Sequence, residues 1–318
     1  MKFINKLIAG RGLCNGLTIL IYHRVLPERD PLFPGELTQA QFEWQLDLLA
    51  RDYNVLPLSE AVECLKRGSL PAAAAAITFD DGYADNYTHA LPLLQKYRLP
   101  ATVFVASGYL DGGMMWNERV IHAIRTHAGE AIDLHSLDLG IYTVNTPASR
   151  AALIRQILGK FKYLEHKARE DAVDDLVALL QTSLPDDQMM SSAQLRALAD
   201  SGIEIGAHTR LHPILARLPS MQAYSEMADG CDELEAIIGY RPKLFAYPNG
   251  KPGQDYTAEH VQFAKRLGFI GAVSTAWGCA RPDSDYFQLP RFTPWDQSSL
   301  RFNLRLARNY RQFRYDKV

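Results

Sequence analysis

Short apolar runs alternate with helical repeats along most of the chain. The runs predict buried strands, because apolar stretches bounded by turn residues are typical of parallel sheets. They cover residues 17–22, 55–56, 72–79, 101–106, 203–207, 244–247, 270–274 and 287–289. The stretches between them have helical periodicity, with Thr38 and Ser192 as capping residues at two helix starts. This alternation predicts an α/β fold built on a parallel barrel rather than a sandwich.

The alternation stops between residues 112 and 190. Residues 116–127, 149–164 and 165–180 have helical periodicity, and the strand pattern between them is weak. Because this segment exceeds an ordinary connection between a strand and a helix, we expect a helical insertion or lid-like subdomain. Its histidines are not spaced like a metal site and are interpreted as solvated or locally hydrogen-bonded; they are His122, His127, His135 and His166.

Two adjacent acids, Asp80 and Asp81, follow the apolar run 72–79 and precede Gly82. They therefore lie at the carboxyl end of a predicted strand, where parallel α/β folds carry their chemistry. Neighbouring strand residues point to opposite sides, so the two carboxylates are expected to have different roles. Gly82 allows a sharp turn into a helix predicted at residues 85–97. Taken alone, the acids are better explained as a pair that caps this helix.

Residues 208–213 read His-Thr-Arg-Leu-His-Pro. His208 ends a predicted strand, and Pro213 favours a helix that begins there, directly after His212. Two imidazoles in this arrangement can converge on one ion. Together with one carboxylate they form a ligand set that leaves positions open for water and substrate. Zn²⁺ is the expected cofactor, and Co²⁺, Ni²⁺ or Fe²⁺ would also fit.

Composition narrows the class of protein further. The chain has 318 residues, 47% of them apolar, which is enough for one large domain or two ordinary ones. A formal charge of −2 gives no support for nucleic acid as the main partner. The cysteines are scattered and suggest neither a disulfide framework nor a thiolate zinc site; they are Cys14, Cys64, Cys231 and Cys279.

The two ends of the chain bear on its location. The first residues carry Lys2, Lys6 and Arg11, but their apolar run is short and no small-residue cleavage site follows. We therefore expect a cytoplasmic protein, or one held loosely at a membrane face. Residues 298–314 predict a basic amphipathic helix that could contact anionic lipid or an acidic glycan. The alternative is a helix packed across the barrel with its arginines in solvent.

Four motifs occur in a fixed order: TFDDGY at 78–83, HTRLHP at 208–213, FAYPNG at 245–250 and LPR at 289–291. Together they resemble the polysaccharide deacetylase family, carbohydrate esterase family 4, from about residue 17 to about residue 295. The first two motifs are specific in combination, whereas the last two are weaker. The resemblance implies a single distorted, seven-stranded (β/α) barrel domain and metal-dependent removal of acyl groups from amino sugars.

The resemblance also assigns roles to individual residues. Asp80 corresponds to the general base and Asp81 to the metal-binding carboxylate. His208 and His212 correspond to the metal-binding histidines. Asn249, in the FAYPNG turn, is the candidate for the backbone N–H that stabilises the oxyanion. The alternative for this last segment is an ordinary Pro-Asn-Gly turn.

The sequence departs from the family pattern at two places. Ala246 stands where the family often carries an arginine, and Arg291 could supply that charge and hold Asp80 ionised. No histidine follows His260, although the family has a late histidine as general acid. His23 is the predicted replacement, because the first and last strands of a barrel are neighbours. A His23 that is only part of the packed core is the alternative.

The leading functional hypothesis is a metal-dependent hydrolase that removes N-acetyl groups from N-acetylhexosamine units of a polysaccharide or its lipid-linked precursor. A second hypothesis keeps the metal and changes the substrate: an O-acetyl esterase, a sugar deformylase or a small-amide hydrolase. Substrate choice is expected to lie in residues 33–37 and in the insertion around Trp116. A third hypothesis is an inactive glycan-binding protein, against which the retained Asp80 speaks.

Overall fold

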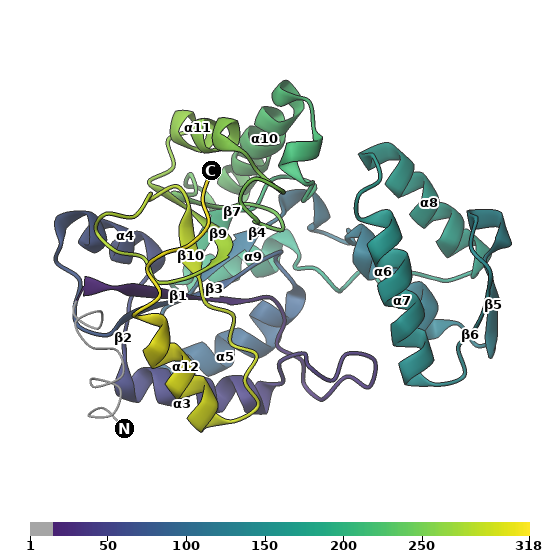
Figure 1. Ribbon diagram of the computed structural model, residues 1–318, viewed down its shortest axis with the longest axis horizontal. Helices are drawn as coiled ribbons and strands as arrows, with labels where there is room; N and C mark the ends of the chain where they lie inside the picture. The colour runs from purple at the N-terminus through teal and green to yellow at the C-terminus, as the bar shows by residue number, and fades with distance from the viewer. Residues whose placement is uncertain (1–14) are drawn as a thin grey trace.

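The computed structural model describes residues 15–318, and its centre is a parallel sheet curled into a nearly closed barrel (Figure 1). The strands of the barrel path follow one another in the order β1, β3, β4, β7, β8, β9, β10. Their bounds are β1 Leu17–Tyr22, β3 Ala74–Phe79, β4 Thr102–Val105, β7 Glu204–Ala207, β8 Leu244–Ala246, β9 Gly271–Trp277 and β10 Leu289–Arg291. A further short strand, β2 (Asn54–Val55), pairs with the start of β3. The predicted seven-stranded barrel is confirmed.

Backbone hydrogen bonds bring the first and last strands of the barrel together. The Ile21 N–H donates to the Phe292 carbonyl at 3.0 Å, and the Phe292 N–H donates to the Ile19 carbonyl at 2.7 Å. These bonds place the residues after β10 beside β1, although the two segments lie far apart in the sequence. The predicted neighbourhood of the chain's first and last strands is therefore confirmed.

Helices cover the outside of the barrel and one end of it (Figure 1). They are α3 Gln39–Asp52, α4 Leu58–Arg67, α5 Leu91–Tyr97, α9 Ser192–Asp200, α10 Ser220–Ile238, α11 Ala258–Arg266 and α12 Ser299–Asn309. A π-helical turn, Asn86–Ala90, precedes α5, and short 3₁₀ turns lie at Ser107–Tyr109, His135–Leu137 and Leu215–Arg217. Thr38 caps α3 with a capping box, as predicted. The prediction for α9 was wrong by one residue, because Ser191 and not Ser192 accepts the N3 hydrogen bond.

The residues of β3 alternate between two apolar clusters. Ala75, Ile77 and Phe79 pack with α3 and α5, whereas Ala74 and Ala76 pack with α4 and the facing strands. Every residue of β3 is buried, as expected for a strand covered on both faces. The alternation fixes which way the residues that follow the strand will point.

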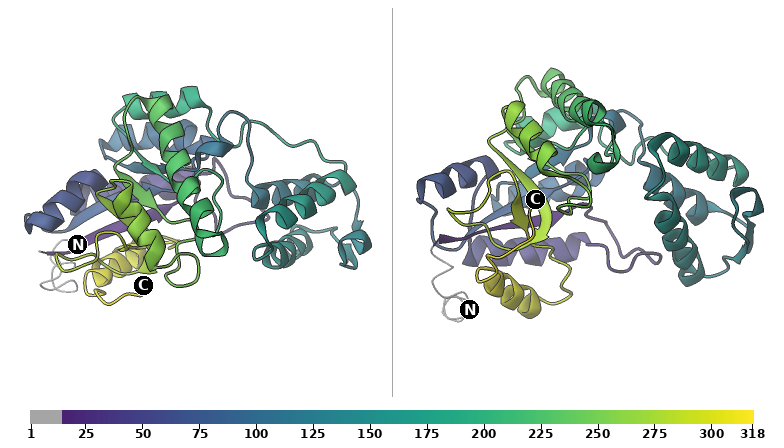
Figure 2. Two further views of the ribbon diagram at one scale, coloured as in Figure 1. Left: turned by 90° about the horizontal axis from the view of Figure 1, so that it is seen from above. Right: turned by 45° about the horizontal axis from the view of Figure 1, so that its top comes forward.

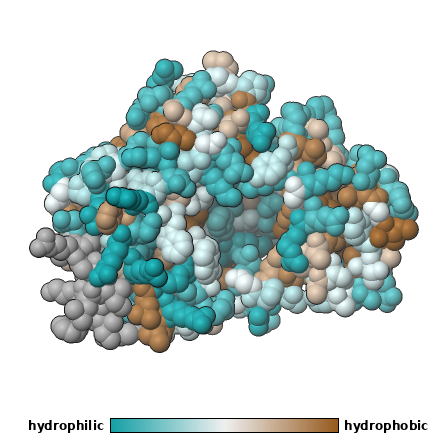
Figure 3. All heavy atoms as spheres, viewed as in Figure 1, coloured by the Kyte–Doolittle hydropathy of each residue, from teal (hydrophilic) through white to brown (hydrophobic). Residues whose placement is uncertain are grey.

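Residues between β4 and α9 form a separate helical unit with its own apolar core. It contains the helices α6 Trp116–Thr126, α7 Pro147–Phe161 and α8 His166–Leu179, and a two-stranded hairpin of β5 Ala131–Asp133 and β6 Ile141–Thr143. The unit stands beside the barrel in all three views (Figures 1 and 2). The structure thus has the helical insertion predicted for residues 112–190, and the space-filling view is hollowed between it and the barrel (Figure 3).

The C-terminal helix is shorter than predicted. We expected it at residues 298–314, but α12 ends at Asn309. The chain then follows the barrel, where the Cys279 N–H donates to the Gln312 carbonyl at 2.6 Å, and this pairing competes with further helix. The helix buries Phe302 and Leu306 and leaves Arg301 and Arg308 exposed.

The cysteines and the two ends of the chain were also subjects of predictions, and the structure describes them within residues 15–318. Cys64, Cys231 and Cys279 are free thiols. Within this range, none of the helices has both the length and the apolar character needed to cross a bilayer. Lys2, Lys6, Arg11 and Cys14 lie outside the described residues.

Candidate active site

The two acids after β3 are held in a strained turn that sends them to different partners. Asp81 has φ 78° and Gly82 has φ 92°, both in the left-handed region that favours glycine. A Cβ on Gly82 would lie 2.9 Å from Cγ1 of Val105, so this position has no room for a side chain. Strain of this kind persists where the surrounding fold imposes it, and it is concentrated at functional sites.

Asp80 forms a bidentate ion pair with Arg291. Both carboxylate oxygens accept from the guanidinium at 2.7 Å, and the Arg291 Nε donates to the Ser274 carbonyl at 2.8 Å. Arg291 is 1% exposed. Burial alone would raise the pKa of Asp80, but the charges of Arg291 and His208 outweigh it and lower that pKa. Asp80 is therefore held ionised and oriented, as proposed for Arg291 from the sequence.

Asp81 lies between the two histidines. Its Oδ1 is 3.4 Å from Nε2 of His208 and 3.4 Å from Nε2 of His212, and the three ligand atoms lie within 4.8 Å of one another. This buried Oδ1 has no hydrogen-bond partner in the described part of the chain, although buried polar atoms are normally paired. An orphaned carboxylate oxygen facing two imidazole nitrogens fits a divalent cation. The predicted ligand set is thus brought together.

Each histidine is prepared for coordination in its own way. His208 contacts the Ala246 carbonyl through Nδ1 at 2.7 Å, which orients the ring and leaves Nε2 for the cation. Burial lowers the pKa of His212 to about 4, so that ring is neutral at physiological pH. The helix predicted to begin at Pro213 is wrong. His212 has φ 51°, outside the helical region, and the following α-helix begins only at Ser220.

Asn249 follows β8 and His23 follows β1, so the two residues come from different strands of the barrel. Asn249 has φ 58° and lines the same cavity as Asp81 and His212. Its backbone N–H donates to no other protein atom among residues 15–318. His23 directly follows β1, is exposed, and adds to the charges that lower the pKa values of Asp80 and Asp81. Both positions agree with the predicted roles, which the geometry alone does not assign.

The cavity over the ligand set is shared by the barrel and the insertion. It has a volume of about 210 Å³, and its barrel side includes Ile214 in addition to the residues above. The insertion supplies the opposite wall with Met115, Trp116, Asn117, Leu158, Lys162 and Arg169. Trp116 was expected near the substrate, but Lys162 and Arg169 were not predicted. The only available signal was that both basic residues flank the turn between two helical stretches.

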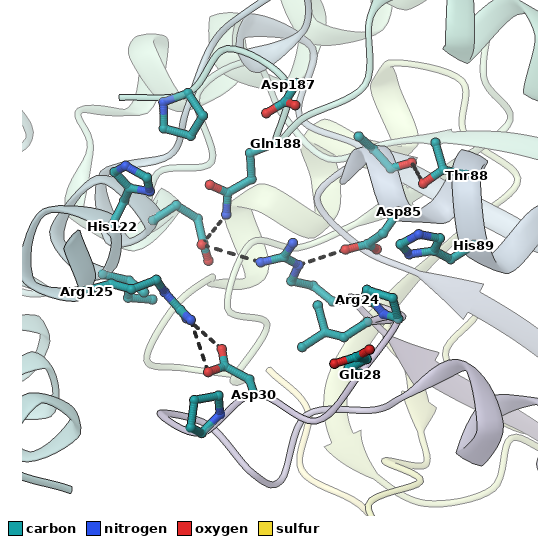
Figure 4. A pocket seen from close by; sticks show the side chains of 17 residues that line it. Arg24, Glu28, Asp30, Asp85, Thr88, His89, His122, Arg125, Asp187 and Gln188 are labelled. Carbon is teal, nitrogen blue, oxygen red and sulfur yellow. Dashed lines mark hydrogen bonds and ion pairs between the residues drawn. The ribbon is translucent and has the colours of Figure 1, made fainter. Parts of the chain in front are cut away.

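A second and larger cavity, of about 560 Å³, lies between the loop after β1, the π-helical turn before α5 and α6 (Figure 4). Arg24 lies at its centre and donates to Asp85 at 2.8 Å, with Glu118 at 3.8 Å. Arg125 of α6 reaches Asp30 of the loop at 2.6 Å. None of the predicted catalytic or metal-binding residues lines this cavity.

Comparison with known proteins decides the family. The family model described as polysaccharide deacetylase matches residues 67–174 and 175–272, which is more than half of the chain. The chain belongs to the polysaccharide deacetylase family. The resemblance inferred from the four motifs is therefore confirmed, and so is the prediction of a polysaccharide deacetylase-like hydrolase at the level of this family.

Relatives of known name agree with this family assignment. YxkH of Bacillus subtilis, whose name assigns it provisionally to the polysaccharide deacetylases, is 24% identical over 86% of this chain and 70% of its own. A poly-β-1,6-N-acetyl-D-glucosamine N-deacetylase of Staphylococcus aureus is 30% identical over 40% of this chain. That alignment spans 48% of the enzyme, so the chain matches about half of the enzyme's length.

Solved structures show the same fold. The deacetylase PplD of Streptococcus pyogenes superposes with a TM-score of 0.62 at 20% identity, covering 92% of this chain and 98% of its own. IcaB from Ammonifex degensii gives a TM-score of 0.60 at 21% identity, covering 93% and 97%. At this level of identity the similarity establishes the barrel fold alone.

Proposed function

We propose that this protein is a metal-dependent deacetylase that removes N-acetyl groups from N-acetylhexosamine units of a polysaccharide or of its lipid-linked precursor. The observation that carries the proposal is the cluster of Asp81, His208 and His212 beside an ion-paired Asp80. The similarity to an enzyme named for N-deacetylation of poly-N-acetylglucosamine supports the choice of substrate class.

The ligand set supports a zinc ion, with cobalt, nickel or iron as alternatives, because two imidazoles and one carboxylate suit these borderline metals. When bound, such a cation lowers the pKa of a coordinated water and polarises the amide carbonyl. Asp80, kept ionised by Arg291, accepts the proton of the attacking water. The Asn249 N–H donates to the developing oxyanion, and His23 donates a proton to the leaving amine.

Acetate release tests this proposal directly. Protein loaded with Zn²⁺ or Co²⁺ is incubated with β-1,6-linked N-acetylglucosamine oligomers. We expect Asp80→Asn to lower kcat by about 10²- to 10⁴-fold, because a positioned general base contributes that much. The metal content, measured by elemental analysis, should stay unchanged in this variant. Absence of acetate from every N-acetylated glycan with metal-loaded wild type would contradict the proposal.

His23→Ala tests the general acid separately. We expect kcat to fall by about 10²-fold or more, with the largest loss on substrates whose amine leaves poorly. His135→Ala is the matched control, because this exposed histidine lies on the far hairpin of the insertion. Full activity of His23→Ala would show that another group protonates the amine.

Contact with a membrane face and a cytoplasmic location stay predictions. The outer surface of α12 supports the first, since Leu300 and Leu304 are exposed beside Arg301 and Arg308. Co-sedimentation with anionic vesicles, compared between wild type and Leu300→Ser, measures this contact. Equal sedimentation of both proteins would contradict it.

A further inference from the structure

Two basic side chains of the insertion line the cavity over the metal ligands. Lys162 follows the end of α7, and Arg169 lies in the first turns of α8. Both line the same 210 Å³ cavity as Asp81 and His212. The proposed reaction at the acetamido group does not use either charge, so their presence needs a separate explanation.

Arg169 is buried, and its Nε makes no hydrogen bond to the acid nearest to it. It is 4% exposed, and its Nε has no hydrogen-bond partner among the described residues. The nearest carboxylate oxygen, Glu170 Oε1, is 3.8 Å from Nε, beyond hydrogen-bond distance. Glu170 is within ion-pair distance of Arg169 but is shared with Arg119, which is closer to it at 3.1 Å and also pairs with Asp174.

The remaining contacts of Arg169 hold the guanidinium in place without neutralising it. Its Nη2 contacts Nδ1 of His166 at 3.0 Å, and its plane lies over the Trp116 ring at 5.1 Å from the centroid. A buried ionised group whose N–H donor makes no hydrogen bond is costly, and the shared Glu170 at 3.8 Å does not supply that bond. A bound anion would remove that cost.

Lys162 adds a second positive charge to the same wall. It is half-buried, and its Nζ lies 5.9 Å from the centroid of the Tyr163 ring. Within residues 15–318 no carboxylate lies within ion-pair distance of it. Its charge is therefore directed at the cavity and the adjoining solvent.

The charges around the cavity do not balance for a neutral ligand. Asp80 is neutralised by Arg291, and a dication held by Asp81 leaves one positive charge at the ligand set. Lys162 and Arg169 raise the total over the side chains that line the cavity to three positive charges, with Glu170 behind Arg169 outside this lining. An N-acetylhexosamine carries no charge, so its binding leaves these positive charges without a negative partner.

We propose that the substrate carries an anionic oxygen group, a carboxylate or a phosphate, on the acylated sugar or on the unit next to it. Lys162 and Arg169 bind this group and position the acetamido carbon over the ligand set. The inference rests on the proposed deacetylase function and narrows its substrate to acidic glycans or phosphate-linked sugars.

Three probes compare the substrate classes. They are a neutral N-acetylglucosamine oligomer, an oligomer that alternates N-acetylglucosamine with glucuronic acid, and N-acetylglucosamine 1-phosphate. We expect one anionic probe to have a kcat/KM at least about tenfold above the neutral one at low salt, because hydrogen bonds to charged groups contribute that much. The advantage should shrink as ionic strength rises. The identity of the anionic probe with the higher kcat/KM shows whether the site recognises a carboxylate or a phosphate.

Variants assign the effect to the two side chains. Lys162→Gln should lower kcat/KM about tenfold on the preferred anionic probe and change it less than twofold on the neutral oligomer. Arg169→Gln should act in the same way, with Arg169→Lys restoring part of the loss, and circular dichroism checks that both fold. Lys160→Gln is the matched control, since that amine is exposed and donates to the Leu137 and Asp138 carbonyls.

Binding to Asp80→Asn, measured by calorimetry, separates this inference from the proposed function. Tighter binding of an anionic probe than of the neutral oligomer, without acetate release by wild type, would support the charge inference and contradict the deacetylase. Equal binding of all three probes would overturn the inference even if wild type releases acetate. The inference would also be overturned if Lys162→Gln lowered kcat/KM equally on the neutral and the anionic probes.

Discussion

The barrel edge and the helical insertion hold their charged groups in contrasting ways. At the barrel edge, Asp80 and Arg291 form a fully buried bidentate pair whose residues are 211 positions apart. The insertion is tied to the rest of the molecule by a buried hydrogen bond, from the Tyr83 hydroxyl to Glu118 at 3.0 Å, and by more exposed contacts, such as Arg125 with Asp30 and Tyr163 with Gln254. Buried pairs are costly to break, whereas exposed ones contribute little. The barrel thus fixes the reacting groups with a buried ion pair, and the insertion adds a wall whose ion pairs to the rest of the molecule are more exposed.

Breaking the buried pair should have the largest effect on stability. Arg291→Met leaves Asp80 buried without its counter-ion, and we expect the free energy of unfolding to fall by about 3–5 kcal/mol. Urea unfolding measures it. Arg301→Met, an exposed arginine of α12, should change stability by less than about 0.5 kcal/mol. A loss in Arg291→Met as small as in this control would contradict the contrast between the two regions.

The second-largest effect is expected on metal binding, when a predicted metal ligand is removed. His212→Ala is expected to weaken zinc binding by more than about 100-fold, since even the outer partners of ligands can contribute that much. Competition with a chromophoric chelator measures the affinity of wild type and variant. His135→Ala in the insertion should bind zinc as wild type does. Unchanged affinity in His212→Ala would show that the cluster is not the metal site.

The smallest effect on stability is expected at the contact between the insertion and the loop after β1. Burial alone would raise the pKa of Asp30, but the hydrogen bonds from Arg125 and from the Leu32 N–H lower it below the ordinary value of 3.8. Its contribution to stability is therefore fully present above about pH 4 and is lost as the pH falls through the lowered pKa. We expect it to stay below about 1 kcal/mol.

Asp30→Asn checks this contribution. The difference in unfolding free energy between wild type and Asp30→Asn should be constant from pH 7 to about pH 5 and shrink toward zero below pH 3. The exposed Asp283→Asn is the control and should show no such dependence. A difference that grows as the pH falls would contradict the assigned direction of the pKa shift.

The strand pattern was predictable because it is local. The bounds of β1 agree with the predicted 17–22, and the apolar run before Asp80 gave the position of β3 within two residues. The order of the motifs was also sufficient to predict the family and the ligand set. These features follow from burial periodicity and from residue types at short spacing.

Other features of the site depend on contacts that no local pattern reveals. Instead of the helix expected from Pro213, His212 has a left-handed backbone, and its ring lies 3.4 Å from Asp81. Lys162 and Arg169 line the cavity only because α7 and α8 turn their junction toward the barrel. Their position beside the turn between two helical stretches is the only sequence feature that separates them from solvated charges on a helix.

The sequence by itself determined the succession of strands and helices, the acids at the end of β3 and the paired histidines of the ligand set. Tertiary structure alone decided the burial and bidentate geometry of the Asp80–Arg291 pair, of which the sequence predicted only the charge, and it placed two cations of the insertion over the ligands. The physical reason is how far apart in the sequence the interacting residues are. Burial and backbone preferences act on neighbouring residues, whereas charge pairing in a shared cavity requires segments that only the closed barrel and its packed insertion bring together.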